Sequence, residues 1–111
     1  MTAKNQDFEM YEGDSKKLVF DTSGVDIADI TEVSWSATDN SNKDSELITK
    51  SLTGGGITTD ETESTITVTL DSADTEDLST RGLVHELEIE DTAGNKNTAA
   101  VGHMKLIRDI N

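Results

Sequence analysis

Two alternating runs in residues 81–109, joined by a turn, constrain the fold of this chain more than any other feature. The first run has an apolar-rich side and an acidic side: Leu83, His85, Leu87 and Ile89 on one, and Val84, Glu86, Glu88 and Glu90 on the other. Such alternation is typical of a strand with one buried face. Residues 91–95 are predicted to form a turn, because Gly94 and Asn95 tolerate positive φ. The segment therefore predicts one long β-hairpin, whose return strand carries Val101, Met104, Leu106 and Ile107.

Further alternating runs predict short strands along the rest of the chain. Residues 7–11 and 16–21 form an expected opening hairpin around a turn at 13–15. The other strands are expected at residues 32–38, 46–52, 57–59 and 65–70. Loops are expected at residues 39–45 and 53–56, and an irregular connection at 22–30. Gly102, inside the last strand, predicts a bulge or a bend.

One short helical turn is predicted near residues 72–78, within the polar stretch 71–80. Ser72 is the expected N-cap, and Glu76 is placed near the start of the turn, where a negative charge is favourable. Leu78 is expected to pack beneath the sheet.

These elements predict an all-β fold: an Ig-like antiparallel β-sandwich of about seven or eight strands. The length of the chain predicts a single domain over residues 1–111, with residues 1–6 as a flexible lead. Trp35, the only tryptophan, is interpreted as a core anchor rather than a ligand platform. The predicted core consists of the inward-facing side chains of Phe8, Leu18, Phe20, Trp35, Ile66, Val68, Leu70, Leu87 and Ile89.

The charge balance narrows the classes of partner. The chain has 23 Asp and Glu against 9 Lys and Arg, for a formal net charge of −14. A surface of this sign repels nucleic acid and anionic lipid, so neither nucleic acid nor a membrane is an expected partner. The acids are dispersed, which favours adaptation to a saline or hypersaline habitat; the alternative is an acidic face for a basic partner or cations. The chain has no Cys for disulfides, and its polar N-terminus predicts no signal peptide.

No pattern for catalysis or for a cofactor was found, so neither is expected. His85 lies on an apolar side and His103 follows Gly102, and both are interpreted as ordinary strand residues rather than metal ligands. No serine lies in a Gly-x-Ser-x-Gly elbow. The glycines at 54–56 are not followed by Gly-Lys-Ser/Thr, so they predict a turn and not a phosphate loop.

Calcium is the one ion with candidate ligands. Asp71, Asp74 and Asp77 recur within one short turn, and Asp91 and Asn95 flank another. Ca²⁺ takes several oxygen ligands, so such loops could bind it. Their spacing does not match an EF-hand loop, and capping and solvation are the favoured interpretation.

The second half of the chain resembles a pattern in small structural proteins of tailed phages and prophages. That pattern has an acidic turn, a strand ending "E-L-x-I-x-D", a "G-N" turn and a last strand with an internal glycine. The matching residues are Asp74, Thr75, Leu78, Gly82, Glu86, Leu87, Ile89, Asp91, Gly94, Asn95, Val101 and Gly102. The N-terminal module of baseplate upper proteins is similar in this respect.

This resemblance implies a non-enzymatic virion protein, present in many copies or as a homo-oligomer and docking on other virion proteins. Capsid decoration, neck and baseplate adaptor remain open as its position, and the acidity suggests a halophilic or marine system. Residues 1–6 and 107–111 are the expected docking arms. The alternative is a calcium-binding or carbohydrate-binding surface module of an extracellular protein.

Overall fold

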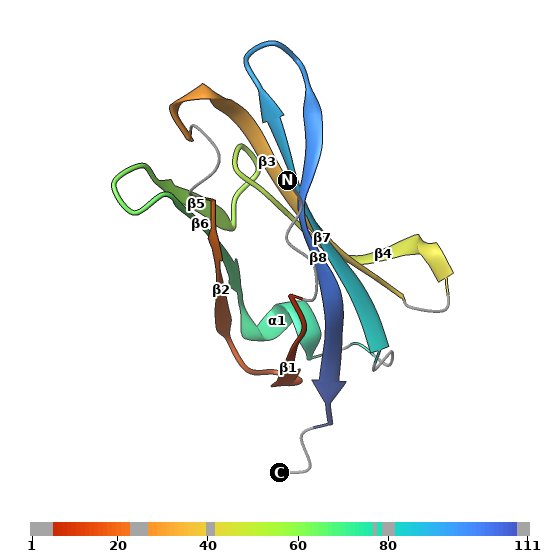
Figure 1. Ribbon diagram of the computed structural model, residues 1–111. Helices are drawn as coiled ribbons and strands as arrows, with labels where there is room; N and C mark the ends of the chain where they lie inside the picture. The colour runs from red at the N-terminus through yellow and green to blue at the C-terminus, as the bar shows by residue number, and fades with distance from the viewer. Residues whose placement is uncertain (1–5, 23–26, 40–41, 77, 79–81, 109–111) are drawn as a thin grey trace.

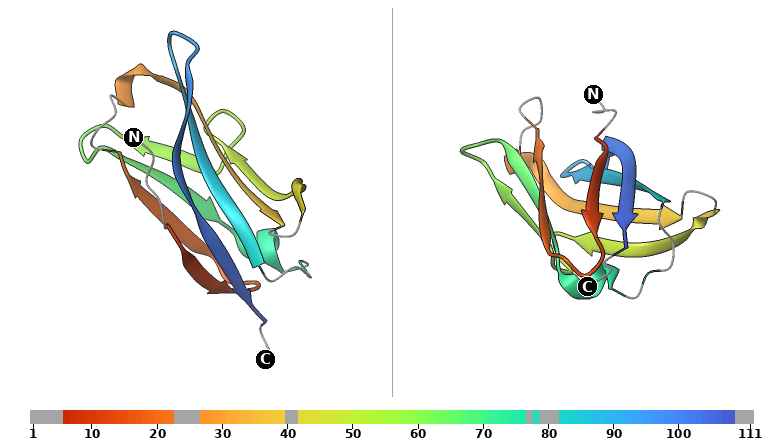
Figure 2. Two further views of the ribbon diagram at one scale, coloured as in Figure 1. Left: turned by 45° about the vertical axis from the view of Figure 1, so that its right-hand side comes forward. Right: turned by 90° about the horizontal axis from the view of Figure 1, so that it is seen from below.

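The chain folds as two facing β-sheets, shown in Figures 1 and 2. The computed structural model describes residues 6–22, 27–39, 42–76, 78 and 82–108, with the main chain alone at 42–45. The strands are β1 (Phe8–Tyr11), β2 (Lys16–Asp21), β3 (Ile30–Asp39), β4 (Asn42–Ser51), β5 (Ile57–Asp60), β6 (Thr65–Leu70), β7 (Gly82–Asp91) and β8 (Lys96–Ile107). The short elements η1 (Ile27–Asp29) and α1 (Ser72–Thr75) are single helical turns.

The sheet order is that of an Ig-like sandwich. One sheet has the order β1-β8-β7-β3-β4 and the other β2-β6-β5. Strands β8, β7 and β3 thus take the places of strands G, F and C, and β2, β6 and β5 those of B, E and D. The predicted fold class is therefore confirmed, with one departure: β1 runs parallel to β8.

The C-terminal hairpin forms as its alternation predicts. Strands β7 and β8 pair antiparallel, from Glu90 opposite Lys96 to Gly82 opposite Lys105. Gly94 closes the turn with φ of 84°, a conformation that glycine adopts without a steric penalty. The glutamates of β7 lie on the outer face of the sheet, because Leu87 and Ile89, which alternate with them, are buried.

The prediction that Gly102 marks a bulge or a bend was wrong. The register of β8 shifts between Leu87 and Glu88 of β7, where Ala100 and Thr98 are the partners, so the extra residue is Ala99. Gly102 is regularly paired with His85. A Cβ atom at Gly102 would lie 2.9 Å from His85 Nε2 and even closer to the carbonyl of Gln6. Glycine is therefore required here for a close approach of two main-chain segments.

The predicted opening hairpin does not form. Strand β1 pairs with β8, and β2 pairs with β6 in the opposite sheet. Both strands have the expected alternation, but alternation does not identify the partner of a strand. The turn between them crosses from one sheet to the other, and the N–H of Gly13 there donates to Thr75 Oγ1 of α1 at 2.8 Å.

The segment 39–45, expected to be a loop, belongs mostly to a hairpin. Strand β3 continues to Asp39 and β4 begins at Asn42, which pairs with it. Two register shifts near Thr38 accompany this pairing. The polar composition misled the prediction, because polar residues occur in strands as well as in loops.

The helical turn was predicted in the right place but with the wrong cap. Helix α1 has Asp71 as its N-cap, and its carboxylate forms a capping box with Asp74. Ser72 is the first helical residue, and Glu76 is the C-cap rather than a residue near the start. Leu78 packs against the core as expected.

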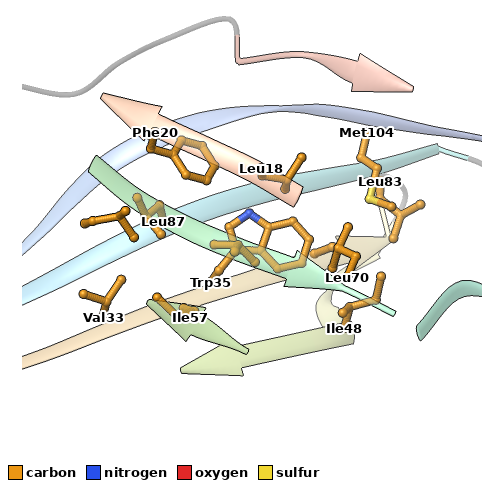
Figure 3. Close-up of a cluster of buried hydrophobic side chains, with 14 of the residues drawn as sticks. Leu18, Phe20, Val33, Trp35, Ile48, Ile57, Leu70, Leu83, Leu87 and Met104 are labelled. Atoms are coloured by element: carbon orange, nitrogen blue, oxygen red, sulfur yellow. The ribbon is translucent and has the colours of Figure 1, made fainter. Parts of the chain in front are cut away.

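The core fills the space between the sheets around Trp35, as Figure 3 shows. Trp35 on β3 is completely buried, between Leu87 of β7 and Lys50 of β4 in the sheet register. The predicted core residues Leu18, Phe20, Trp35, Ile66, Val68, Leu70, Leu87 and Ile89 are all buried. Phe8 is partly buried and packs against this cluster. The core also contains further residues beyond the predicted set: Met10, Val33, Ala37, Ile48, Ile57, Leu83, Ala100, Met104 and Leu106.

We expect Gly102→Ala to lower the free energy of unfolding by about 1–3 kcal/mol, because the added methyl group would push against Gln6 and His85. Urea unfolding measures this cost. The control is the same substitution in a chain lacking residues 1–6, where the clash with Gln6 is absent and the cost should be smaller. An equal cost in both backgrounds would contradict the proposed clash.

Candidate functional site

A polar cluster centred on the buried Trp35 and His85 attaches the start of the chain to the five-stranded sheet. Trp35 Nε1 donates to His85 Nδ1 at 3.1 Å, and His85 Nε2 lies 2.5 Å from the carbonyl oxygen of Gln6. The His85 ring also contacts Phe8 edge-on, with centroids 5.1 Å apart, and lies 6.3 Å from the Phe20 ring. Gln6, which was expected in a flexible lead, is held further by its own N–H, which donates to Val101 at 3.0 Å.

The hydrogen bonds fix the protonation state of His85. Nδ1 accepts from Trp35, so it carries no proton, and the proton of the neutral ring is on Nε2, which donates to Gln6. Burial lowers the pKa of His85 below its usual value, against the opposing effects of Gln6 and Asp7, and His103 lowers it further. A second proton would place an N–H on Nδ1 facing the Trp35 N–H, so the cluster requires the neutral ring.

A shallow groove opens beside this cluster, between the start of β1 and strand β2. It has a volume of about 260 Å³, and His85 and Phe20 are among its lining residues. Lys17, Val19 and Asp7 also line it. The groove therefore lies where the two sheets separate at one side of the sandwich.

The two histidines do not converge on a site. His85 is buried, whereas the side chain of His103 is 69% exposed. Asp7 accepts from the N–H of His103 at 2.8 Å, and its carboxylate lies 3.7 Å from His103 Nδ1. Within the described part of the chain, no cluster of three or more His, Asp or Glu side chains could hold a metal ion.

The calcium candidates lie in two separate places. Asp71 and Asp74 belong to α1, and Asp91 and Asn95 to the β7–β8 turn at the other end of the sandwich (Figure 1). Asp77 lies outside the described residues. The carboxylate of Asp74 is held by Lys50 at 2.8 Å and accepts from the N–H of Asp71 at 2.7 Å. Asp74 thus stabilises the helical turn and attaches it to β4.

Asp91 organises the β7–β8 turn. Its Oδ1 accepts from the N–H of Ala93 at 3.0 Å and of Asn95 at 2.9 Å. These bonds, those from Asn95 first, lower the pKa of Asp91. The side chain is therefore a structural acceptor in the arrangement that aspartate commonly adopts in turns.

Glu32 has a structural role that sequence reasoning missed. Its Oε1 accepts from the N–H groups of Val33 at 2.9 Å and Leu52 at 3.1 Å, and Oε2 accepts from the Thr53 hydroxyl. The Thr53 hydroxyl is the main reason that the pKa of Glu32 is lowered. Glu32 thus holds the loop after β4 against β3. Its partners Leu52 and Thr53 follow it in the sequence by 20 and 21 positions, so no local motif could have identified this role.

Comparison of the chain with protein-family models and with curated proteins found no match. No helix in the described segments has the length and apolar character needed to cross a membrane.

We expect the free energy of unfolding to fall as the pH decreases from about 7.5 to about 5.5, because the pKa of His85 is lowered in the folded state and the unfolded chain then binds more protons. The lowered pKa values of Asp91 and Glu32 act only at more acidic pH. Urea unfolding at several pH values measures the slope.

The two histidines supply a matched pair of variants for this measurement. His85→Asn keeps an acceptor for Trp35 but does not titrate, so the slope should become smaller. The exposed control His103→Asn should keep most of it. A slope that disappears in the His103→Asn variant but persists in the His85→Asn variant would contradict its assignment to His85.

Calcium should leave the thermal midpoint unchanged relative to the same concentration of magnesium, because Asp74 and Asp91 already have internal partners. Calorimetry with each salt in millimolar excess over the protein measures this. A rise of the midpoint with calcium alone, removed by Asp91→Asn, would show a site in the β7–β8 turn and contradict the expectation.

Proposed function

We propose that this protein is a non-enzymatic structural module of a tailed-virus particle, which docks on other virion proteins through the edges of its sheets. The finer position, as capsid decoration, neck or baseplate adaptor, and a halophilic or marine system are parts of the same proposal. The observation that carries it is the open architecture. Both sheets end in strands that have no further strand partner among the described residues: β1 and β4 in one sheet, and β2 and β5 in the other.

Open edges are suited to assembly because each one presents main-chain donors and acceptors. An extended segment of a neighbour can add to such an edge and gain hydrogen bonds along its length, while its side chains fill adjacent pockets. The groove beside β2, with its partly apolar lining, is a surface of this kind.

The residues that resemble phage structural proteins have structural roles in this chain. Asp74 completes the capping box of α1, Leu87 and Ile89 belong to the core, and Asp91 organises the last turn. Gly102 allows the close approach of Gln6. The shared pattern is thus one of fold construction, which supports a common module and does not indicate a common ligand site.

The composition supports assembly in a salt-rich medium. A chain of net charge −14 repels its own copies at low ionic strength, and screening shortens that repulsion to about 3 Å at 1 M salt. Contacts in such a particle would have to depend on apolar burial and main-chain hydrogen bonds.

Mass spectrometry of purified virus particles from the organism that encodes the chain tests the proposal. We expect its peptides in particles washed in molar salt, at a copy number comparable with that of known capsid or tail proteins. The soluble fraction of the same lysate is the control. Peptides found in that fraction and missing from the particles would refute the proposed function.

A further inference from the structure

Strand β2 is an edge strand with an unusual exposed side chain. It is the outer strand of the sheet β2-β6-β5. Val19, at its centre, is 62% exposed, although the flanking Leu18 and Phe20 are buried. Val19 and Tyr11 are the exposed large hydrophobic residues among those described. An apolar side chain in the middle of an open edge is a feature that soluble proteins usually avoid.

The main chain of β2 is oriented for pairing at this edge. The N–H of Thr22 donates to the carbonyl of Ser64 at 2.8 Å, in register with the antiparallel pairing of β2 and β6. In an antiparallel ladder, alternate residues direct both main-chain groups to the same neighbour. The even-numbered residues of β2 therefore face β6, and Lys17 and Val19 direct their N–H and C=O groups toward the open edge.

The sequence of the edge is complementary to itself. If two copies of β2 pair antiparallel about Val19, Val19 lies opposite Val19 of the second copy, and Lys17 lies opposite Asp21 of the second copy. These three side chains share the exposed outer face of the strand. The two-fold symmetry of the pair repeats each contact, as in other isologous dimers.

We propose that strand β2 pairs with strand β2 of a second copy of this chain, joining the two three-stranded sheets into one continuous sheet centred on Val19. The inference deepens the proposed assembly function, because it names one edge and its occupant, and it can fail while the virion role stands.

The charge distribution favours this edge for contact between copies. The outward-facing residues of β2 and β6 carry one positive and one negative charge, Lys17 and Asp21, beside the threonines of β6. By contrast, the outer face of β7 carries the glutamates at 86, 88 and 90. Two copies of a chain of net charge −14 therefore meet with little local repulsion at β2.

A lysine on an edge strand can also serve to block pairing. Here Lys17 would oppose a carboxylate rather than another lysine, so the two interpretations predict opposite effects of its substitution. If Lys17 blocks pairing, its removal should increase association. If Lys17 pairs with Asp21, reversal of its charge should decrease association.

Disulfide trapping of the full chain tests the proposal. The chain has no Cys, so Val19→Cys introduces a single thiol. Residues in hydrogen-bonded antiparallel pairs have Cα atoms about 5.5 Å apart, which lies within the range for a disulfide. The control is Thr67→Cys, on the same outer face but on the neighbouring strand β6. We expect the oxidised dimer to form at least about tenfold faster from Val19→Cys, after correction for the reactivity of each thiol with a small reagent.

Charge reversal then tests the register. Lys17→Asp, added to Val19→Cys, should slow dimer formation about tenfold in 0.15 M NaCl, because it places like charges opposite each other twice. The exchange Lys17→Asp with Asp21→Lys should restore the rate. The unsubstituted chain should sediment as a monomer–dimer equilibrium, which Lys17→Asp shifts toward the monomer.

Other outcomes would overturn the inference. Equal trapping from Val19 and Thr67 would show random collision. A rate that Lys17→Asp leaves unchanged or increases would exclude the paired register. A monomer at every concentration would mean that something else covers the edge, such as an extended segment of another protein. The particle test of the proposed function does not depend on any of these results.

Discussion

The hydrogen bond from Trp35 to His85 is the interaction on which the sandwich most depends. In antibody domains the corresponding tryptophan packs against a disulfide between the two sheets. This chain has no Cys, and the ring of His85 lies within contact range of Trp35, Phe20 and Phe8. Because buried polar groups are costly unless they are satisfied, His85 also requires the carbonyl of Gln6. The main chain at Gln6 is thereby attached to the core.

That requirement explains several features that otherwise look unrelated. Gly102 has no side chain because the Gln6 carbonyl and the His85 ring occupy the space beside it. Strand β1 pairs with β8 rather than with β2, so the chain crosses between the sheets right after it. The crossing leaves β2 as an open edge, with a groove between it and the start of β1. The polar centre of the core and the candidate docking edge are thus consequences of one arrangement.

The accuracy of the sequence prediction varied with the range of the interactions involved. Alternation located β3, β6 and β7 and the buried side of each, because a period of two is a local property. The same signal could not show that β1 and β2 belong to different sheets. Among the candidate ligands, Asp74 belongs to the capping box of α1 and Asp91 accepts main-chain hydrogen bonds in the β7–β8 turn. The bonds of Glu32 to Leu52 and Thr53, and the ion pair between Lys50 and Asp74, join segments about twenty residues apart and had no local signature.

The sequence by itself determined the fold class, the apolar side of each main strand and the strong negative charge, since these follow from local periodicity and composition. Only the tertiary structure decided which strands are neighbours, which groups bond to the two ring nitrogens of His85, and which edge remains open. The physical reason is that strand pairing and hydrogen-bond satisfaction are properties of the packed whole. His85 illustrates this, because the alternation places it on the apolar side of its strand, but only the packed structure brings Trp35 and the carbonyl of Gln6 to its ring nitrogens.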